Sequence, residues 1–345
     1  MNKKLIAVAL AALPVAAMAD VTIYGTLSGG LEHDTYSAGA PSQNKVEDYT
    51  SLIGFKGSED LGNGLKTVWQ VESRFNLDGT GTSTLATRQT FVGLDGGNLG
   101  LIRMGHLNTV ENDQYSVDQW SDGTGVNGLQ LFDSGSRLNN AIRYDSASFA
   151  GFSGAIGYGF GEDATTGVSS SDVLTYGVNY NTPLDGLALH YAGNYDTNPT
   201  AQGSQGRKAN TNLFEADYSQ GNLFLSGAYK WATGYDFGNA VAKDDAAAWV
   251  GLKTHQIALS AAYSFGAIKP KISYAKGWNG SFNGSTIQDS GYTQYVVGVD
   301  YALSKRTTVG VAYGHMSQGA YLSQTASTAN VPAVSTTSVQ MSTSF

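Results

Sequence analysis

Alternation of apolar and polar residues along short segments is the feature that most constrains how this chain can fold. In residues 21–28 the odd positions are apolar or small and the even positions are polar, and in residues 338–345 Val339 and Met341 alternate with polar residues in the same way. Side chains along a β-strand point to opposite faces, so each such segment has one apolar and one polar face. Beyond the N-terminal segment no window shows a convincing helical period, which indicates an all-β fold.

Sixteen segments carry the strand pattern. They lie near residues 21–33, 46–57, 64–75, 86–95, 98–107, 137–146, 151–160, 172–181, 186–195, 211–219, 222–231, 255–264, 267–276, 292–302, 305–315 and 335–345. Tight turns rich in Gly, Asn, Asp and Pro alternate with long polar loops, which is typical of outer-membrane barrels. Because an even strand number lets the last strand pair with the first, the sequence predicts a closed 16-stranded antiparallel transmembrane β-barrel.

The composition agrees with a barrel and excludes other classes. Charged residues make up 14% and hydrophobic residues 41% of the 345 residues, and beyond the N-terminus no apolar run approaches the ~20 residues of a membrane helix. In a barrel only every second strand residue has to be apolar. The absence of cysteine excludes disulfides and thiolate metal sites, and the net charge of −8 argues against nucleic-acid binding.

A soluble, exported β-protein is the alternative fold. A lectin-like sandwich needs two apolar inner faces packed on each other, which this Gly- and Ser-rich sequence struggles to supply. We find no repeat of the length that a propeller or a β-helix requires. The membrane barrel is therefore the favoured interpretation.

Residues 1–19 have the features of a secretory signal peptide. Two lysines at positions 3 and 4 precede an apolar stretch that ends at Val15, and Ala17 and Ala19 fit the small-x-small cleavage pattern. A membrane anchor is disfavoured, because the stretch is too short and the chain turns polar at Asp20. Cleavage would leave residues 20–345 as one barrel domain and, without the two lysines, change the net charge from −8 to −10.

Charged residues in the strands should face the inside of the barrel, because Arg or Lys at the middle of the lipid face costs about 2–4 kcal/mol. Alternation places Arg74 on the polar face of its segment, opposite Trp69. In residues 87–94 we expect Arg88 and Thr90 on the polar face and Phe91 and Gly93 on the other, and we expect Arg103 to be peripheral. The long loop 107–137 contains acidic residues and no basic residue before Arg137. Its acidic residues are Glu111, Asp113, Asp118, Asp122 and Asp133.

Several segments taken together resemble one known family. They are Asp20–Thr26, Gly54–Lys66, Arg88–Leu94, Arg143–Ser146 and the terminal Phe345. In these segments and over its whole length the chain is similar to the Gram-negative general diffusion porins, especially the neisserial and β-proteobacterial branch. It departs from them at Leu52 and His106, where related porins often carry basic residues.

The resemblance implies a homotrimer in the Gram-negative outer membrane, in which the third extracellular loop, about 107–137, folds inward and forms a constriction. It implies a basic wall facing an acidic loop across the pore. By position, Arg88 and Arg137 match two arginines of the family's wall, and Glu111 and Asp113 match its acidic side. We also assign Arg74, Lys56 and His106 to the basic side and Asp118 and Asp122 to the acidic side. Phe345 would be the signal read by the barrel assembly machinery, and lipid and lipopolysaccharide would surround the barrel.

The sequence thus predicts an outer-membrane porin, a water-filled channel for passive diffusion of ions and small hydrophilic solutes, with no enzymatic activity, cofactor or metal. An outer-membrane hydrolase would need an assembled Ser–His–acid or paired-acid site, whereas the five histidines lie in five separate segments. An adhesin or receptor, which would have longer and more aromatic loops, is a third possibility. Residues 123–128 fit G-x-G-x-x-G but neither follow a strand nor open a helix, so we interpret them as loop.

Overall fold

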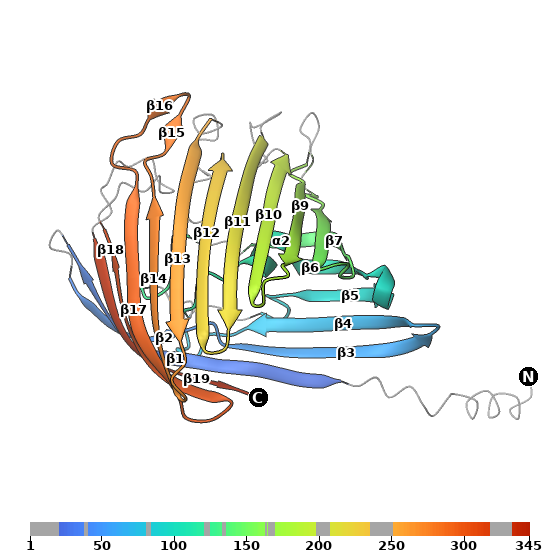
Figure 1. The fold of residues 1–345 in the computed structure, drawn as a ribbon, viewed down its shortest axis with the longest axis horizontal. Helices are drawn as coiled ribbons and strands as arrows, with labels where there is room; N and C mark the ends of the chain where they lie inside the picture. Colours follow the sequence, from blue (N-terminus) through green and yellow to red (C-terminus); the bar gives the residue numbers. More distant parts are fainter. Residues whose placement is uncertain are drawn as a thin grey trace, which may run out of the picture.

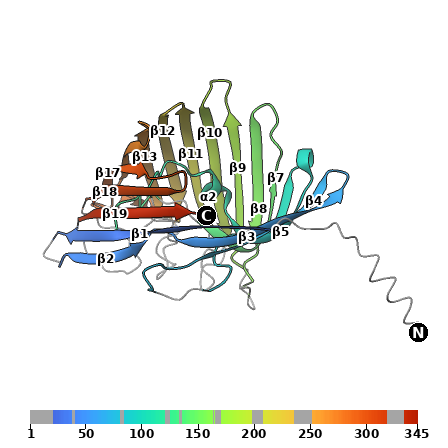
Figure 2. The same cartoon turned by 90° about the horizontal axis from the view of Figure 1, so that it is seen from below.

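A computed structural model describes residues 21–37, 41–80, 84–120, 125–132, 136–162, 164, 170–197, 208–234, 251–317 and 333–345. Its strands form one antiparallel sheet that closes on itself (Figures 1 and 2). The predicted signal peptide, 1–19, and Asp122 and Asp133 lie outside the described residues. No helix in the described part is long and apolar enough to cross a membrane.

Almost all of the described secondary structure consists of strands that follow one another along the chain. The strands are β1 (Thr22–Tyr36), β2 (Gln43–Asp48), β3 (Leu52–Gly62), β4 (Leu65–Arg74), β5 (Thr90–Asp95), β6 (Leu101–Asn108), β7 (Arg137–Asp145), β8 (Phe152–Gly159), β9 (Val173–Asn181), β10 (Leu187–Thr197), β11 (Lys208–Gln220), β12 (Leu223–Thr233), β13 (Lys253–Tyr263), β14 (Ile268–Gly277), β15 (Ser281–Phe282), β16 (Ser285–Thr286), β17 (Tyr292–Ala302), β18 (Thr307–Met316) and β19 (Val334–Ser344). The two short helices are η1 (Gly97–Leu99) and α2 (Val110–Gln114).

Sixteen of the nineteen described strands make up the barrel, which confirms the predicted fold class. β2 pairs with residues 29–34 of β1 and β3 with residues 22–26, so β2 and β3 share one position beside β1. β15 and β16 form a small hairpin in the loop between β14 and β17. Subtracting β2, β15 and β16 from nineteen leaves sixteen. Short turns such as 63–64 and 221–222 lie at one rim and long connections at the other, as predicted.

Pairing of the last strand with the first closes the barrel. β19 runs antiparallel to β1 from Thr26 opposite Ser344 to Tyr36 opposite Val334. Beyond this ladder the Gly25 amide donates to the Phe345 carbonyl at 3.2 Å, and the Phe345 amide donates to the Gly25 carbonyl at 3.1 Å. A Cβ on residue 25 would lie 2.6 Å from Cζ of the Phe345 ring, so this approach requires glycine.

Deleting Phe345 should weaken this closure. The deletion removes two backbone hydrogen bonds, each contributing about 1 kcal/mol, so we expect the folded barrel to unfold at a lower temperature than the full chain. Phe345→Ala keeps the backbone bonds and should lose less. Heating followed by electrophoresis under non-denaturing conditions measures the folded fraction. Equal stability of the deletion variant and the full chain would contradict this account of the closure.

The two faces of the sheet differ sharply in character. Large apolar side chains on the outward face are exposed, among them Ile23 (58%), Ile272 (53%) and Val339 (55%). Their neighbours along each strand point inward, and many of these are polar; Lys271 and Ser273, on either side of Ile272, are both buried. This alternation repeats around the barrel, as expected where lipid covers the outside and water or polar groups fill the inside.

The face predicted for β5 and the position predicted for Arg103 are wrong. Gln70 is on the inward face of β4, and Phe91 lies opposite it, so Phe91 and Gly93 point inward. Val92 and Leu94 alternate with them and are exposed on the outward face. The centroid of the Phe91 ring lies 5.1 Å from the guanidinium carbon of Arg103, which therefore also points inward. Thr90 alternates to the outward face together with Val92.

Candidate functional site

We call the connection between β6 and β7, residues 109–136, the β6–β7 segment. Its described residues, 109–120, 125–132 and 136, pack against the inward face of the sheet. It begins with α2, whose N-cap residue Thr109 accepts a hydrogen bond from the Asn112 amide at 3.2 Å. The Val110 amide then donates to Thr175 Oγ1 on β9 at 2.7 Å. Threonine at the N-cap and a threonine acceptor on the strand thus satisfy helix amides that would otherwise be left without partners.

Further hydrogen bonds join the rest of the described segment to inward side chains of successive strands. The Ser116 amide donates to Glu215 on β11 at 2.8 Å, and Trp120 Nε1 donates to Ser273 Oγ on β14 at 2.8 Å. Farther along, Gln294 Nε2 on β17 donates to the Val126 carbonyl at 3.2 Å. The Val126 amide donates to Thr336 Oγ1 on β19 at 3.0 Å. The segment therefore contacts inward side chains from β9 to β19.

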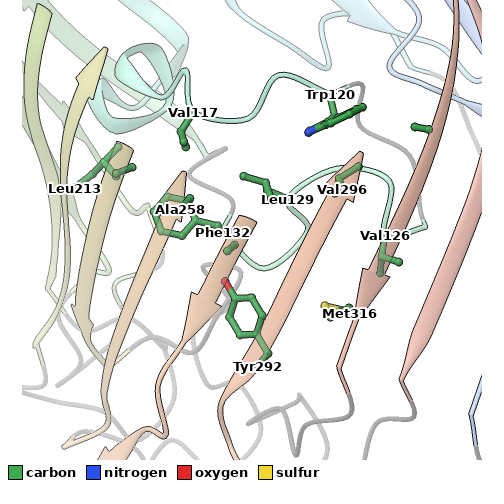
Figure 3. Close-up of a cluster of buried hydrophobic side chains, with 13 residues drawn as sticks. Val117, Trp120, Val126, Leu129, Phe132, Leu213, Ala258, Tyr292, Val296 and Met316 are labelled. Carbon is green, nitrogen blue, oxygen red and sulfur yellow. The ribbon is translucent and has the colours of Figure 1, made fainter. Parts of the chain in front are cut away.

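An apolar cluster between the segment and the strands strengthens this attachment (Figure 3). Phe132 and Val117 of the segment and Leu213 and Ala258 of the strands are fully buried in it. Complete burial of a large apolar side chain contributes about 1.5–3 kcal/mol. The other fully or largely buried members are Trp120, Val126, Leu129, Ala228, Ala275, Tyr292, Val296, Ala312 and Met316.

Glycine on β18 permits the closest approach. A Cβ on Gly314 would lie 1.8 Å from the Val126 carbonyl oxygen, and one on Gly298 of β17 would lie 2.9 Å from the Trp120 ring. Atoms at these distances would overlap, so only glycine allows the segment to lie this close to the two strands.

A buried ion pair joins the start of the segment to β12. Glu111 Oε1 lies 3.4 Å from Lys230 Nζ, and neither side chain is more than 1% exposed. The other carboxylate oxygen of Glu111 accepts from Asn194 Nδ2 at 2.7 Å and from the Thr211 hydroxyl. Since its side chain is fully buried, Glu111 anchors the segment to the strands and is not exposed to the barrel interior beside the segment.

A second set of ion pairs includes Asp113. Arg143 Nη1 lies 2.6 Å from Asp113, and Arg143 Nη2 lies 2.6 Å from Asp145. Asp145 also accepts from Arg103 Nη2 at 2.8 Å, so the four side chains form a continuous chain across β6, β7 and the segment. The carboxylate of Asp113 is 29% exposed.

Asp118 was also predicted for the acidic side, and it joins two parts of the β6–β7 segment to each other. Its two oxygens accept from the Trp120 amide at 3.1 Å and from the Leu129 amide at 2.9 Å. The sequence prediction treats the loop acids as one surface. In the structure Glu111, Asp113 and Asp118 each have a different set of partners, and Asp122 lies outside the described residues.

Three of the predicted basic residues lie on the inward side along β3 and β4: Lys56 on β3, Arg74 at the end of β4, and Arg88, which pairs with Glu72 of β4. Lys56 is exposed, and its Nζ lies 5.1 Å from the centroid of the Tyr24 ring. Arg74 is also exposed, with Nη2 3.5 Å from Asp48. Arg88 Nε lies 2.6 Å from Glu72, so its charge is closely paired.

The other two predicted basic residues are placed differently. His106 lies opposite Thr90 and alternates to the face of Met104, which is the outward face and not the one that Arg103 occupies. Arg137 is half-buried at the first position of β7, opposite Asn108. Gly105 has a φ of 144°, and the pairing register with β7 shifts directly after it. Sequence alone therefore does not show which residues at this end of β6 point inward and which point outward.

Several charged residues that hold the segment were missed by the sequence analysis. Lys271 on β14 donates to the Gln119 carbonyl at 2.9 Å, has its Nζ 4.4 Å from the centroid of the Trp120 ring, and forms an ion pair with Asp300 at 2.8 Å. Alternation would have placed Lys230, Lys271 and Arg143 on the inward face, since each lies between apolar neighbours. Their partners in the segment could not be found in the same way.

Comparison with known proteins places this geometry in context. The sequence model described as Gram-negative porin matches residues 7–321. The chain is 38% identical over 344 residues to the major outer membrane protein P.IB of Neisseria meningitidis serogroup B, covering 95% of this chain and 97% of that protein. It is also 38% identical to P.IB of Neisseria gonorrhoeae, covering 96% and 98%.

Solved structures share the fold. The anion-selective porin from Comamonas acidovorans superposes with a TM-score of 0.76 at 24% identity, covering 95% of this chain and all of that one. OmpF of Salmonella typhi, in complex with daunomycin, superposes with a TM-score of 0.67 at 21% identity, covering 94% and 97%. At these identities the likeness concerns the fold.

Proposed function

Because the chain belongs to the family of Gram-negative porins and is an outer-membrane β-barrel, we propose that ions and small hydrophilic solutes cross it by passive diffusion through a water-filled pore. The observation that carries this proposal is the contrast between the apolar outward face and the polar inward face of a closed sixteen-stranded barrel. Barrels of this size are wide enough to hold water. Family membership supports a channel rather than an enzyme.

The β6–β7 segment would be the third extracellular loop and would narrow the pore. It covers inward side chains of β9 to β19, whereas Lys56 and Arg74 on β3 and β4 are exposed on the inward face. Solutes would then pass between the segment and this basic side. The field across that gap would attract anions and orient dipolar solutes.

The assembly and targeting of the porin are proposed on the same basis. One of the similar structures, OmpT of Vibrio cholerae, is described in a trimer form, and we propose a homotrimer for this chain. Residues 1–19 would be removed on export, and Phe345 would be read by the barrel assembly machinery. Cross-linking of the folded protein in outer membranes would yield a three-chain species if the homotrimer is correct.

Stepwise conductance in planar bilayers tests the channel function. We expect purified, folded protein to insert in discrete steps and to conduct in KCl. Heat-denatured protein from the same preparation is the control and should produce no steps. Folded barrels that insert but carry no current would overturn the proposal.

A further inference from the structure

Two acidic side chains of β11 contact the same serine of the β6–β7 segment. Glu215 and Asp217 are two positions apart, so both point to the inward face of the strand. The hydroxyl oxygen of Ser116 lies 2.6 Å from Glu215 Oε1 and 2.5 Å from Asp217 Oδ2. The Ser116 amide also donates to Glu215 Oε1, at 2.8 Å. Ser116 therefore joins the segment to both carboxyl groups.

The contacts of Ser116 need more protons than its hydroxyl supplies. A serine hydroxyl has one hydrogen and a carboxylate has none, so Ser116 can donate to only one of the two carboxyl groups. In the other contact, two oxygen atoms that carry only lone pairs would face each other. Both contacts have the length of an O–H···O hydrogen bond. The geometry is therefore satisfied when either Glu215 or Asp217 carries a proton.

A histidine on β10 indicates which of the two carboxyl groups is ionised. His190 Nε2 lies 3.2 Å from Asp217 Oδ2, and its Nδ1 lies 2.7 Å from Asn179 Oδ1. An imidazolium ion donates from both nitrogens, so protonated His190 satisfies both acceptors and gives Asp217 a cationic partner.

Glu215 has no such partner. Its side chain is fully buried, and no cation of the described residues lies within ion-pair distance of it. A buried carboxylate without a cation is much more costly than a neutral carboxyl group. These contacts assign the proton to Glu215, which makes the group of Glu215, Asp217 and His190 neutral overall.

The other charged side chains that neighbouring elements direct inward belong to different contacts. Lys230 on β12 is paired with Glu111, Asp113 is paired with an arginine of β7, and Asp118 accepts from amides of the segment. Asp196 lies six residues along β10 from the histidine, which is about 20 Å in a strand. The charge at Ser116 is therefore set by the three titratable groups that surround it.

Protons can reach these groups from inside the barrel. The side chains of His190 and Asp217 are 18% and 13% exposed on the inward face. Glu215, by contrast, is reached only through the contact with Ser116 and Asp217, because it is fully buried. A change of pH in the pore therefore acts on the point where the segment meets β11.

We propose that Glu215, Asp217 and His190 are a pH-sensitive attachment site for the β6–β7 segment. At neutral pH Glu215 is protonated and Ser116 is bonded to both carboxyl groups. At higher pH the proton is lost, two carboxylates face one hydroxyl, and their repulsion loosens this part of the segment. The effect on the channel rests on the proposed function, in which the segment narrows a conducting pore.

Infrared spectroscopy of the folded barrel tests the proton directly. Ordinary carboxyl groups are ionised above about pH 6, so a C=O stretch of protonated carboxyl at about pH 7 comes from a perturbed group. In a detergent without carbonyl groups, we expect wild type to show one such band that Glu215→Gln lacks, and to lose it as the pH rises. Asp185→Asn, which removes an exposed carboxyl group from the turn between β9 and β10, should keep the band.

Unfolding in denaturant, measured from about pH 7 upward, tests the attachment. A proton that is held by the folded barrel and absent from the unfolded chain makes the folded state less stable as the pH rises. The unfolding constant then increases by about tenfold for each pH unit until the proton is lost. We expect this contribution in wild type and in Asp185→Asn, and its absence in Glu215→Gln. Open-channel current noise should rise over the same pH range in wild type and stay low in Glu215→Gln.

Equal infrared bands or an equal pH dependence of unfolding in wild type and Glu215→Gln would overturn the proposal. If the variant does not fold, absence of the band from wild type at about pH 7 would overturn it as well. Loss of the proton without a change in noise would show that the segment is not released. Conductance separates this test from that of the channel: the expected proton loss and unfolding in a barrel that carries no current would contradict the proposed function alone.

Discussion

Lys230→Met is expected to destabilise the porin by about 3–5 kcal/mol, because it leaves the Glu111 carboxylate buried without its cation. Both side chains are almost completely inaccessible, so water cannot replace the lost partner unless the start of the β6–β7 segment moves away from the strands. We therefore expect a lower unfolding temperature and, in planar bilayers, noisier conductance from a segment that is no longer held. Thermal unfolding followed by circular dichroism, together with single-channel recording, measures both effects.

Two further variants separate the effect of leaving a buried carboxylate unpaired from the effect of losing any lysine. Glu111→Gln/Lys230→Met removes both charges and should recover part of the stability, since no unpaired ion remains. Lys305→Met removes an exposed lysine from the turn between β17 and β18 and should unfold as wild type does. If Lys230→Met were as stable as Lys305→Met, the ion pair would not anchor the segment.

Lys56→Gln/Arg74→Gln is expected to shift permeability toward cations. Both side chains are exposed on the inward face, and neither is as closely paired as Arg88, which lies 2.6 Å from Glu72. A unit charge about 5 Å from a passing ion in water contributes about 0.8 kcal/mol, which favours chloride by about fourfold and disfavours potassium by about fourfold, so each lysine or arginine changes the chloride-to-potassium ratio by about sixteenfold at low salt. The reversal potential under a KCl gradient gives the sign and size of the shift.

An outward pair of lysines provides the matched control for this experiment. Lys208 and Lys253, the first residues of β11 and β13, alternate with the buried inward residues Ala209 and Thr254, so both point outward. Lys208→Gln/Lys253→Gln also removes two charges, but from this outward face, so in bilayers of neutral lipid the reversal potential should stay at the wild-type value. A shift of Lys56→Gln/Arg74→Gln toward anions, or an equal shift in the control, would contradict the assignment of the basic side of the pore.

Alternation of apolar and polar residues predicted the fold well, because it depends only on the local rule that successive side chains of a strand point to opposite faces. A long strand such as β4 has enough residues to fix its faces, and Arg74 was correctly assigned to the polar face opposite Trp69. β5 has six residues, and the irregular residues before it break the alternation at Arg88, so its faces were assigned the wrong way round. A short strand flanked by irregular backbone contains too little pattern to determine its orientation.

The site was less predictable, because its contacts join distant parts of the chain. The composition of residues 107–137 identified an acidic loop, but which carboxylate is buried depends on Lys230, 119 positions beyond Glu111. Asp113 is paired with Arg143, across the register shift between β6 and β7. Sequence alone gives the charges of such residues but not the strand positions that bring them together.

The contact between Val126 and Thr336 has a consequence for the order of assembly. The two residues are 210 positions apart, and Thr336 belongs to the strand that is synthesised last. The part of the β6–β7 segment around Val126 therefore cannot reach its final partners until β19 has been added to the sheet, so the docking of this part and the closure of the barrel become a single late event. A chain that stalls before its C-terminal strand would have neither a closed wall nor a finished passage.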